Sequence, residues 1–324
     1  MRERLVVVWR VTTRCNLACP FCACDRTLTR SRPEADSGLI ARTGSSLARW
    51  SERTGRPVLV SWLGGEPLRW PQLTELSERF HRLGLQLSTT TNGTPLVNPN
   101  LRRLLVERFA ELTVSVDGFA GTHDTLRGRR GLFDEMRGHV NRLATEIADA
   151  GSSLVLRANV VLMRRTISEF PRLCRELTSW GIREITCNQL GGADRTEFFP
   201  ANRLLPEQID QLHEDWPGLQ AELAADGVRL LGGAAYLQRM AASSRGERLD
   251  VMECGPGRRF LFIDEAGRVA PCSFTGNEYG IPIENIESAD AWENLPERFS
   301  EARRCHRSSR CSDCHSTQVF NKFA

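Results

Sequence analysis

The sequence predicts an α/β fold in which an open, partial (β/α)6 barrel precedes a small α+β C-terminal domain. From Leu5 to Gln189, short β-branched or apolar runs alternate with helical patterns. Strands that alternate with helices are typical of βα units and a parallel sheet. Six such units are too few for a closed barrel of eight strands. We therefore expect an open barrel whose active face lies at the carboxyl ends of its strands.

The six expected strands are short and rich in β-branched residues. Their ranges are Leu5–Thr12, Pro57–Leu63, Leu85–Thr91, Leu112–Val116, Leu154–Val161 and Glu184–Gln189. Between them, five segments carry apolar residues at intervals of three and four, which indicates helices that pack on the sheet. These helices are expected at Gly38–Thr54, Pro71–Leu83, Pro99–Phe109, Phe133–Ala150 and Ile167–Trp180.

The alternation stops around Gly191–Asp194, where polar residues and prolines mark a boundary. We expect the barrel over residues 1–195, a helical linker region over 196–245 and a second domain over 246–324. The elements expected beyond the boundary are a helix over Pro206–Asp226 with a kink or break at Pro217, a hairpin of Arg259–Asp264 and Arg268–Ser273 around Glu265–Gly267, and a last helix over Ala289–Arg303.

The composition excludes several classes of protein. The chain has 324 residues, 40% of them hydrophobic, and no apolar run approaches the roughly 20 residues that cross a bilayer. The 43 basic and 40 acidic residues are interspersed, so the charge gives no case for a nucleic-acid or membrane partner. No secretory signal is readable before the first strand, and we expect a cytoplasmic location.

Eleven cysteines are unusual in a chain without a readable export signal, because a reducing compartment disfavours structural disulfides. Such a chain more often uses cysteines for metal or redox chemistry. Four cysteines lie near the start of the chain and five near its end, while only Cys174 and Cys187 fall between. Two separate metal sites are therefore expected.

The first cysteine group is a C-x3-C-x2-C triplet of Cys15, Cys19 and Cys22, directly after the first strand. Three thiolates on one loop can bind three corners of a four-iron four-sulfur cluster and leave the fourth corner to a small molecule. A structural zinc loop is the alternative, because a further cysteine, Cys24, stands nearby. The spacing of this segment leaves both interpretations open.

The second expected strand ends in Gly64-Gly65-Glu66-Pro67. Two glycines let a backbone approach a ligand closely, although a simple turn would use them too. A glycine pair of this kind after the cysteine triplet resembles the radical S-adenosylmethionine (SAM) family. The resemblance implies that the triplet binds a four-iron four-sulfur cluster, that the open iron holds SAM, and that Gly64, Gly65, Glu66 and Pro67 contact the SAM amino group.

Further segments follow in the order of this family. Thr113–Gly118, followed by His123–Gly128, resembles the fourth-strand segment of the branch that carries extra clusters. The resemblance implies further SAM contacts: Phe21 near the adenine, Ser115 and Asp117 near the ribose or carboxylate, and Arg157 and Asn159 at the carboxylate. Each of these residues also has a structural alternative. Phe21 could be a loop aromatic that covers the edge of the core, and Asp117-Gly118 could be a plain turn. His123 could cap a helix, and Arg157 could be bonded to solvent or to a neighbouring glutamate.

The second cysteine group lies in the last 71 residues, from Cys254 onward. Cys254, Gly267 and Cys272 match the pattern that opens the SPASM and twitch domains of the family, and Cys311 and Cys314 would close it. The resemblance implies one auxiliary four-iron four-sulfur cluster on these four cysteines, as in the shorter twitch form. Cys305 is a possible substitute for Cys311 or Cys314, and a zinc site of four cysteines is the alternative.

The resemblance also implies an activity and its partners. The enzyme would cleave SAM reductively, and the 5'-deoxyadenosyl radical would remove a hydrogen atom from a substrate carbon, with electrons from a flavodoxin- or ferredoxin-type donor. The first interpretation is an enzyme that modifies a ribosomal peptide or another natural-product precursor. A dehydrogenase or epimerase of a small polar molecule, such as an aminocyclitol or sugar, is the second. A non-enzymatic zinc-binding protein is the third.

Several residues are candidates for the substrate side of the reaction. Cys187 on the sixth strand would donate a hydrogen atom if it faced the barrel, although a strand cysteine is more often a small buried hydrophobe. Cys24 and Cys305 are also candidate hydrogen donors, whereas the helical pattern around Cys174 predicts a core residue. The charged residues expected at the substrate mouth, unless they are solvated loop charges, are Asp194, Arg195 and Glu197.

Overall fold

The computed structural model describes residues 3–22, 24, 31–191, 195 and 197–323. Its centre is one ten-stranded sheet with the order β10-β9-β8-β1-β2-β3-β4-β5-β6-β7. The strands are β1 Leu5–Thr12, β2 Val58–Gly64, β3 Gln86–Thr91, β4 Glu111–Ser115, β5 Val155–Leu162, β6 Glu184–Gln189, β7 Arg229–Leu230, β8 Phe260–Ile263, β9 Arg268–Ala270 and β10 Ile281–Pro282. The six predicted barrel strands are confirmed, and β7 and β10 were not predicted.

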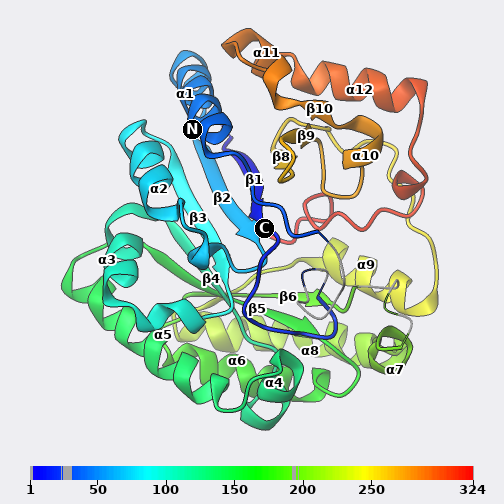
Figure 1. The fold of residues 1–324 in the computed structure, drawn as a ribbon. Helices are drawn as coiled ribbons and strands as arrows, with labels where there is room; N and C mark the ends of the chain where they lie inside the picture. Colours follow the sequence, from blue (N-terminus) through cyan, green and yellow to red (C-terminus); the bar gives the residue numbers. More distant parts are fainter. Residues whose placement is uncertain (1–2, 23, 25–30, 192–194, 196, 324) are drawn as a thin grey trace.

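Neighbouring strands from β1 to β7 pair in parallel, and β8 also pairs in parallel with β1. The hairpin of β8 and β9 and the pairing of β9 with β10 are antiparallel. The sheet has two free edges, so the barrel is open, as predicted. The predicted C-terminal hairpin therefore extends the barrel sheet at the edge of β1, and Figure 1 shows these elements beside one another.

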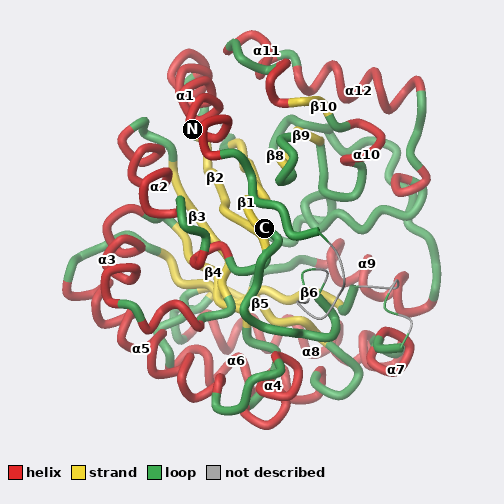
Figure 2. Tube along the Cα trace, viewed as in Figure 1, coloured by secondary structure: helices red, strands yellow, loops and turns green. Residues whose placement is uncertain are grey.

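Helices surround the curved sheet in Figure 2, where the strands form an inner layer. Those between the barrel strands are α1 Ser37–Thr54, α2 Leu73–Arg82, α3 Pro99–Arg108, α4 Ala120–Arg127, α5 Leu132–Asp149 and α6 Phe170–Ser179. Those that follow β6 are α7 Phe199–Asn202, α8 Pro206–Ala225, α9 Ala234–Arg245, α10 Gly276–Tyr279, α11 Ala289–Glu293 and α12 Leu295–Cys305. The short helix α4 and helices α7, α9 and α10 were not predicted.

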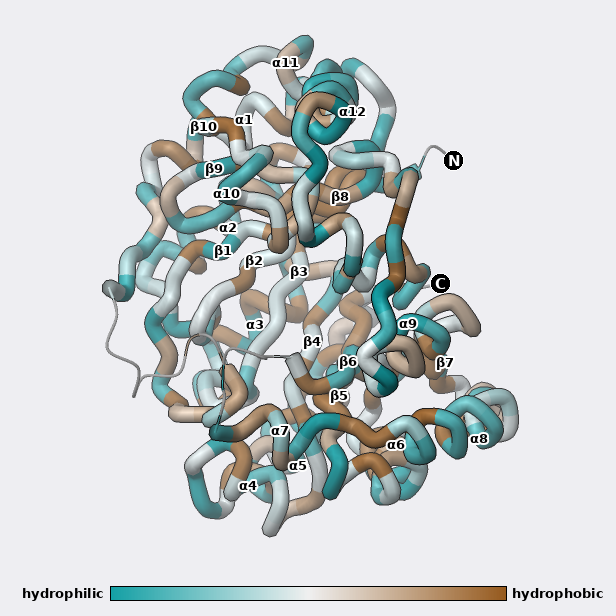
Figure 3. The backbone as a smooth tube through the Cα atoms, turned by 90° about the vertical axis from the view of Figure 1, so that its right-hand side faces the viewer, coloured by the Kyte–Doolittle hydropathy of each residue, from teal (hydrophilic) through white to brown (hydrophobic). Residues whose placement is uncertain are grey.

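Buried and half-buried side chains alternate along β1 and distinguish the two faces of the barrel wall. Leu5, Val7 and Trp9 are buried and belong to the hydrophobic core, whereas Val6 and Val8, which point the other way, are half-buried. Alternate side chains of a strand point to opposite faces of a sheet. The first set therefore packs against the helices and the second faces the barrel interior. In Figure 3 the outer helices alternate between brown and teal, as expected of helices with one buried and one exposed face.

Two prolines affect helices in different ways. The predicted last helix is wrong in one respect: it is divided at Asn294 into α11 and α12, with Pro296 in the first turn of α12. Proline lacks a backbone N–H and fits a first turn better than a helix interior. In contrast, α8 continues through Pro217, because Trp216 and Leu219 on either side of it are buried in the core. The predicted break at Pro217 is absent from this helix.

None of the helices that the structure describes combines the length and apolar character required to cross a membrane. The division of the chain at residues 195 and 245 stays a prediction, since one sheet runs through both ends of the chain.

Candidate active site

The three predicted cluster ligands lie together on the loop that follows β1, at the carboxyl edge of the barrel. Cys15, Cys19 and Cys22 share one apolar cluster with Leu17 and Leu132, and the predicted aromatic Phe21 packs against it. The loop turns tightly, because the Cys22 backbone N–H donates to the Cys19 carbonyl at 3.0 Å. The thiols of this triplet are therefore held at one place.

Several N–H groups point at these thiols. The Leu17 backbone N–H lies 3.5 Å from the Cys15 Sγ, and the Asn92 Nδ2 lies 3.7 Å from the same atom. Burial raises the pKa of Cys15, and it raises the pKa of Cys19 to about 11. Metal ligation requires the thiolate, so an apolar pocket with N–H donors suits thiols that a metal deprotonates.

Cys24, the possible fourth ligand of a zinc loop, lies next to this group. Its backbone N–H donates to the Cys22 Sγ at 3.3 Å, and a hydrogen bond to Cys22 followed by burial raises its thiol pKa. Within the described residues, no three His, Cys, Asp or Glu side chains converge as the ligands of a single metal ion would. An iron–sulfur cluster requires no such convergence, because each thiolate binds a different iron.

Gly64 and Gly65 bring β2 close to the start of the cysteine loop. A Cβ on Gly64 would lie 2.1 Å from the Thr12 carbonyl oxygen, and one on Gly65 would lie 2.1 Å from the Arg14 carbonyl oxygen. The N–H groups of Gly65 and Glu66 donate to those two carbonyls at 2.9 Å. The glycines therefore fix the loop that carries the triplet, which is a structural role beside the predicted SAM contact.

Glu66 is buried and serves as an acceptor for the loop after β3. Its carboxylate accepts from the Asn92 N–H at 2.7 Å, the Thr91 hydroxyl at 2.9 Å and the Leu68 N–H at 3.1 Å. Burial raises the pKa of Glu66 to about 7, against the opposing effect of these hydrogen bonds. Pro67, the last residue of the glycine motif, is buried at the start of a short 3-10 helix. The motif joins the cysteine loop to β3.

Asn92 is a site residue that sequence reasoning missed. Its Nδ2 donates to the Asn16 Oδ1 at 3.0 Å and faces the Cys15 Sγ, and its Oδ1 accepts from Thr94. The available signal was its position directly after the third strand, where polar residues reach the active edge.

Asp117 and Arg127 form a buried ion pair behind the cysteine loop. The Arg127 Nη2 lies 2.5 Å from the Asp117 Oδ2, and its Nη1 lies 3.9 Å from the Cys19 Sγ. The guanidinium carbon also lies 5.5 Å from the centre of the Phe21 ring. Asp117 further accepts from the Val161 N–H at 2.9 Å, and its own N–H donates to the buried His123. Asp117 thus positions Arg127, a role different from the predicted contact with SAM.

Two of the remaining expected SAM contacts lie deeper in the barrel. Ser115 and Asn159 are register partners on β4 and β5, and both are half-buried on the inner face. Asn159 accepts from the Asn188 amide at 2.9 Å. Their contact with SAM stays a prediction.

The expectation for Arg157 is corrected by the structure. Arg157 lies near the amino end of β5, opposite the edge that carries the cysteine triplet. Its guanidinium pairs with Glu111 at 3.1 Å and, more closely, with Glu184, and these two residues begin β4 and β6. Arg157 therefore closes the amino end of the barrel, the glutamate-bonded alternative foreseen from the sequence.

Cys187 does not face the barrel as its predicted role as a hydrogen donor requires. It pairs in register with Val160, and both belong to the buried core under the helices together with Cys174. The inner face at this level of β6 carries Asn188 instead. The cysteine is the small buried hydrophobe that a strand more often contains.

The residues expected at the substrate mouth are partly described. Arg195 donates to the Cys22 carbonyl at 3.3 Å, which brings the segment after β6 to the cysteine loop. Glu197 is exposed, and Asp194 lies outside the described residues.

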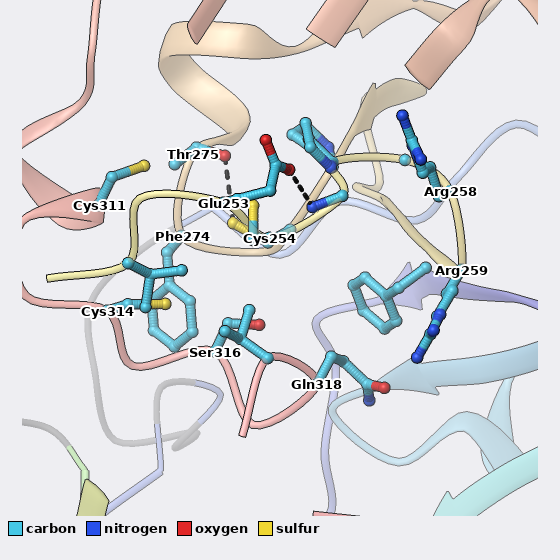
Figure 4. Close-up of a pocket in the computed structure, with 18 of the residues that line it drawn as sticks. Glu253, Cys254, Arg258, Arg259, Phe274, Thr275, Cys311, Cys314, Ser316 and Gln318 are labelled. Atoms are coloured by element: carbon cyan, nitrogen blue, oxygen red, sulfur yellow. Dashed lines mark hydrogen bonds between the residues drawn. The ribbon is translucent and has the colours of Figure 1, made fainter. Parts of the chain in front are cut away.

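The second cysteine group gathers around one cavity of about 580 Å³. Its wall includes all four predicted ligands, Cys254, Cys272, Cys311 and Cys314. Figure 4 shows Cys254, Cys311 and Cys314 around the same space. Burial raises the pKa of Cys254 to about 11, and the three other thiols add to the rise.

Polar contacts hold these cysteines in place. The Cys272 Sγ lies 3.2 Å from the Thr275 hydroxyl, and the buried Arg239 pairs at 2.8 Å with Asp313, which stands between two of the cysteines. Cys305 is exposed at the end of α12 and does not line the cavity. The geometry therefore favours Cys311 and Cys314 over Cys305.

The model of the radical SAM superfamily matches residues 9–177, which include the cysteine triplet and the strands that hold it. The chain belongs to the radical SAM superfamily. Among its relatives is the AdoMet-dependent heme synthase of Methanosarcina barkeri, which is 26% identical over 96% of this chain and 91% of the relative. The mycofactocin maturase MftC of Mycobacterium tuberculosis is also 26% identical, over 96% of this chain and 75% of the relative. The PqqA peptide cyclase of Xanthomonas euvesicatoria pv. vesicatoria is 27% identical over 90% of this chain and 74% of the relative.

Radical SAM proteins of known structure share the fold. Streptococcus suis SuiB bound to S-adenosylmethionine aligns with a TM-score of 0.69 at 16% identity, over 96% of this chain and 72% of SuiB. Native anSMEcpe with bound AdoMet aligns with a TM-score of 0.63 at 16% identity, over 96% of this chain and 88% of that protein. Membership of the radical SAM superfamily makes this chain an enzyme and implies SAM and a four-iron four-sulfur cluster, which the three gathered thiols fit.

Proposed function

We propose that this radical SAM enzyme cleaves SAM reductively and starts the modification of a ribosomal peptide by hydrogen abstraction from a substrate carbon. The observation that carries the proposal is the gathering of Cys15, Cys19 and Cys22 at the carboxyl edge of an open barrel. The cluster, when bound, supplies the electron that breaks a C–S bond of SAM.

The chain's own residues have supporting roles in this proposal. Asn92 and Arg127 direct N–H groups at the thiols of Cys15 and Cys19 and favour their thiolate forms. Leu17 and Leu132 exclude water from the same place. SAM contacts by Phe21, Gly64, Gly65, Glu66, Pro67, Ser115, Asp117 and Asn159 remain part of the proposal, with Asp117 acting through Arg127.

A second, auxiliary four-iron four-sulfur cluster is proposed on Cys254, Cys272, Cys311 and Cys314. Four cysteines complete the ligand set of such a cluster. Their common cavity and the mutual effect of the thiols on pKa support this assignment. The adjacent Arg303 guanidinium lowers the pKa of Cys254 and offsets part of the negative charge of four thiolates. A flavodoxin- or ferredoxin-type electron donor completes the proposal.

The peptide substrate is supported by the relatives. PqqA peptide cyclase is named for a peptide substrate, mycofactocin maturase MftC is named as a maturase, and SuiB has been solved with its precursor peptide SuiA. A second candidate, a tetrapyrrole substrate, rests on the AdoMet-dependent heme synthase, which aligns with 96% of this chain.

Reconstitution with iron and sulfide under anaerobic conditions tests the proposal. The enzyme is expected to convert SAM to 5'-deoxyadenosine and methionine under reductant, and Cys22→Ala is expected to abolish this reaction. Cys305→Ala is the matched control and keeps it. An enzyme that produces no 5'-deoxyadenosine above the Cys22→Ala background would refute the proposed activity. Incubation with candidate precursor peptides or tetrapyrroles then separates the two substrate classes.

A further inference from the structure

The chain contains a single lysine, Lys322, against 42 arginines. This lysine lies in the C-terminal tail, and its side chain is only 4% exposed. Lysine is a compact ammonium on a flexible stem, while arginine is a broad planar cation that is harder to neutralise. The one lysine of the chain is thus a buried cation with properties different from those of every other basic residue.

The tail carries Lys322 into the barrel from the amino ends of the strands. Figure 3 shows the two chain termini on the same side of the molecule, and the cavity of the four cysteines is lined by both Glu3 and Phe323. The Phe323 ring lies 5.4 Å from the guanidinium carbon of Arg157, near the amino end of β5. The tail therefore closes the end of the barrel opposite the cysteine triplet.

The ammonium of Lys322 reaches two amides of the inner barrel face. Its Nζ donates to the Asn188 Oδ1 at 2.8 Å and to the Asn159 Oδ1 at 3.1 Å. The Tyr236 hydroxyl lies 3.0 Å from the Cys187 carbonyl oxygen and 3.2 Å from the Asn188 Oδ1, and its single proton can be donated to either acceptor.

Asn159 and Asn188 are half-buried, whereas Glu184 and Thr186 on the same face of β6 are buried. Lys322 itself lines the cavity of about 580 Å³ that the four cysteines surround, so its ammonium lies beside space that a ligand can enter.

The structure describes no anionic side chain beside Lys322, whose Nζ lies 5.2 Å from the centre of the Phe323 ring. Among the residues that the structure describes, no carboxylate pairs with Lys322. The charged and titratable groups near it are Arg157, Cys187, which lies on the opposite face of β6 in the core, and, through Asn188, Tyr236. Burial lowers the pKa of Lys322 to about 7, and the neighbouring Arg157 contributes in the same direction. A buried cation whose partners are only neutral groups is costly, and an anion that binds beside it would lower this cost.

We propose that Lys322 binds a carboxylate group of the substrate inside the barrel. This inference rests on the proposed function, because it takes the barrel interior as the substrate site. A carboxylate fits the ammonium better than a neutral group, since a charge-assisted hydrogen bond is stronger and restores neutrality. An acidic side chain or C-terminus of a peptide, or a carboxylate of a tetrapyrrole, would supply the same group. The Oδ1 atoms of Asn159 and Asn188 set the direction of the ammonium.

The single lysine makes the test specific. The reconstituted enzyme is treated at pH 7 with N-acetoxysuccinimide, a neutral acetylating reagent, in the presence of acetate or of acetamide at equal ionic strength. Mass spectrometry then measures acetylation of Lys322 and of the N-terminal amine, which serves as the internal reference. Only the neutral amine reacts. If acetate raises the pKa of Lys322 by one unit from about 7, the reaction slows roughly fivefold.

Acetamide is expected to leave the rate unchanged. Asn188→Asp, which supplies a carboxylate from the protein itself, is expected to slow the reaction without acetate and to remove the response to acetate. Asn141→Asp on the exposed face of α5 is the matched control and keeps the wild-type behaviour. Equal rates in acetate and acetamide would overturn the proposal.

If the reagent does not reach Lys322, carbon-13 label at its Cε gives one NMR resonance, whose pH titration is expected to move upward with acetate and not with acetamide. A titration that acetate does not move overturns the proposal as well. The outcome is independent of SAM cleavage. Loss of SAM cleavage with an intact acetate response would refute the proposed function, whereas SAM cleavage without an acetate response would refute only the role of Lys322.

Discussion

The Arg127 guanidinium joins Asp117 at 2.5 Å to the Cys19 thiol at 3.9 Å, and so connects the end of β4 with the predicted cluster loop. The pair is buried, with Asp117 fully inaccessible to solvent. Removal of one partner of such a pair leaves a buried charge without compensation. The stability of the barrel edge and the occupancy of the cluster loop are therefore coupled through Arg127.

Arg127→Met is expected to destabilise the protein by about 3–5 kcal/mol, because it leaves Asp117 buried and unpaired. It is also expected to lower the iron content of the loop. Urea unfolding of the metal-free protein and iron analysis after reconstitution measure the two effects. Arg137→Met removes an exposed pair with Asp134 on α5 and a 3.7 Å pair with the partly exposed Glu176 of α6, and it should change neither quantity appreciably. Similar unfolding free energies for the two variants would contradict the assigned role of Arg127.

Glu66 should make stability depend on pH. Its pKa of about 7 in the folded protein lies above the ordinary value of 4.5, so the folded state binds the proton more tightly than the unfolded state. The free energy of unfolding should therefore fall as pH rises from about 4.5 to 7, by roughly 3 kcal/mol from this group. Glu66→Gln cannot ionise and should lack this contribution.

The difference in unfolding free energy between wild type and Glu66→Gln, measured by urea denaturation from pH 4.5 to 8, reports this effect. Glu75→Gln, at an exposed position of α2, is the control. A difference that stays constant over this range would mean that Glu66 titrates near its ordinary pKa.

Gly44 of α1 faces Phe80 of α2 with no room for a side chain. A Cβ at this position would lie 2.2 Å from the Phe80 ring, which is fully buried. Gly44→Ala is therefore expected to cost about 1–3 kcal/mol through overpacking. Gly138→Ala in α5, where a Cβ meets nothing within 4 Å, should stabilise by about 0.5–1 kcal/mol. Thermal or urea unfolding compares them, and equal effects would show that α1 can shift away from Phe80.

The auxiliary site predicts a selective loss of iron. The reconstituted wild type should hold roughly eight irons per chain, and Cys254→Ala combined with Cys272→Ala roughly four. Cys305→Ala should retain all of them, because Cys305 lies outside the cavity. The double variant should still cleave SAM but form less product if the auxiliary cluster accepts the second electron. Unchanged product formation would make this cluster merely structural.

Much of the fold could be predicted because its signals are local. The strand ranges Leu5–Thr12 and Glu184–Gln189 agree with β1 and β6, since β-branched runs bounded by polar loops define a buried strand. The cysteine triplet was readable for the same reason, because its ligands lie within eight residues. The two-residue strands β7 and β10 carry too short a pattern to be recognised.

The errors arose where long-range position decides the role. Arg157 was expected at the SAM carboxylate, but it pairs with Glu111 near the amino ends of the strands, because a strand pattern does not tell which inward residues reach the active edge. Cys187 required the register with Val160 to show which face it occupies. Lys322 was missed although its uniqueness was visible in the composition, since nothing in the local tail pattern shows that it enters the barrel.

Electron paramagnetic resonance of the reduced Cys254→Ala, Cys272→Ala double variant tests the central claim most directly. This variant retains the cluster loop of Cys15, Cys19 and Cys22 and lacks the auxiliary site. We predict a four-iron four-sulfur signal whose shape changes when SAM is added, because SAM binds the iron that the protein leaves open. A protein that binds zinc and shows no iron–sulfur signal, or a signal that SAM does not change, would contradict the account.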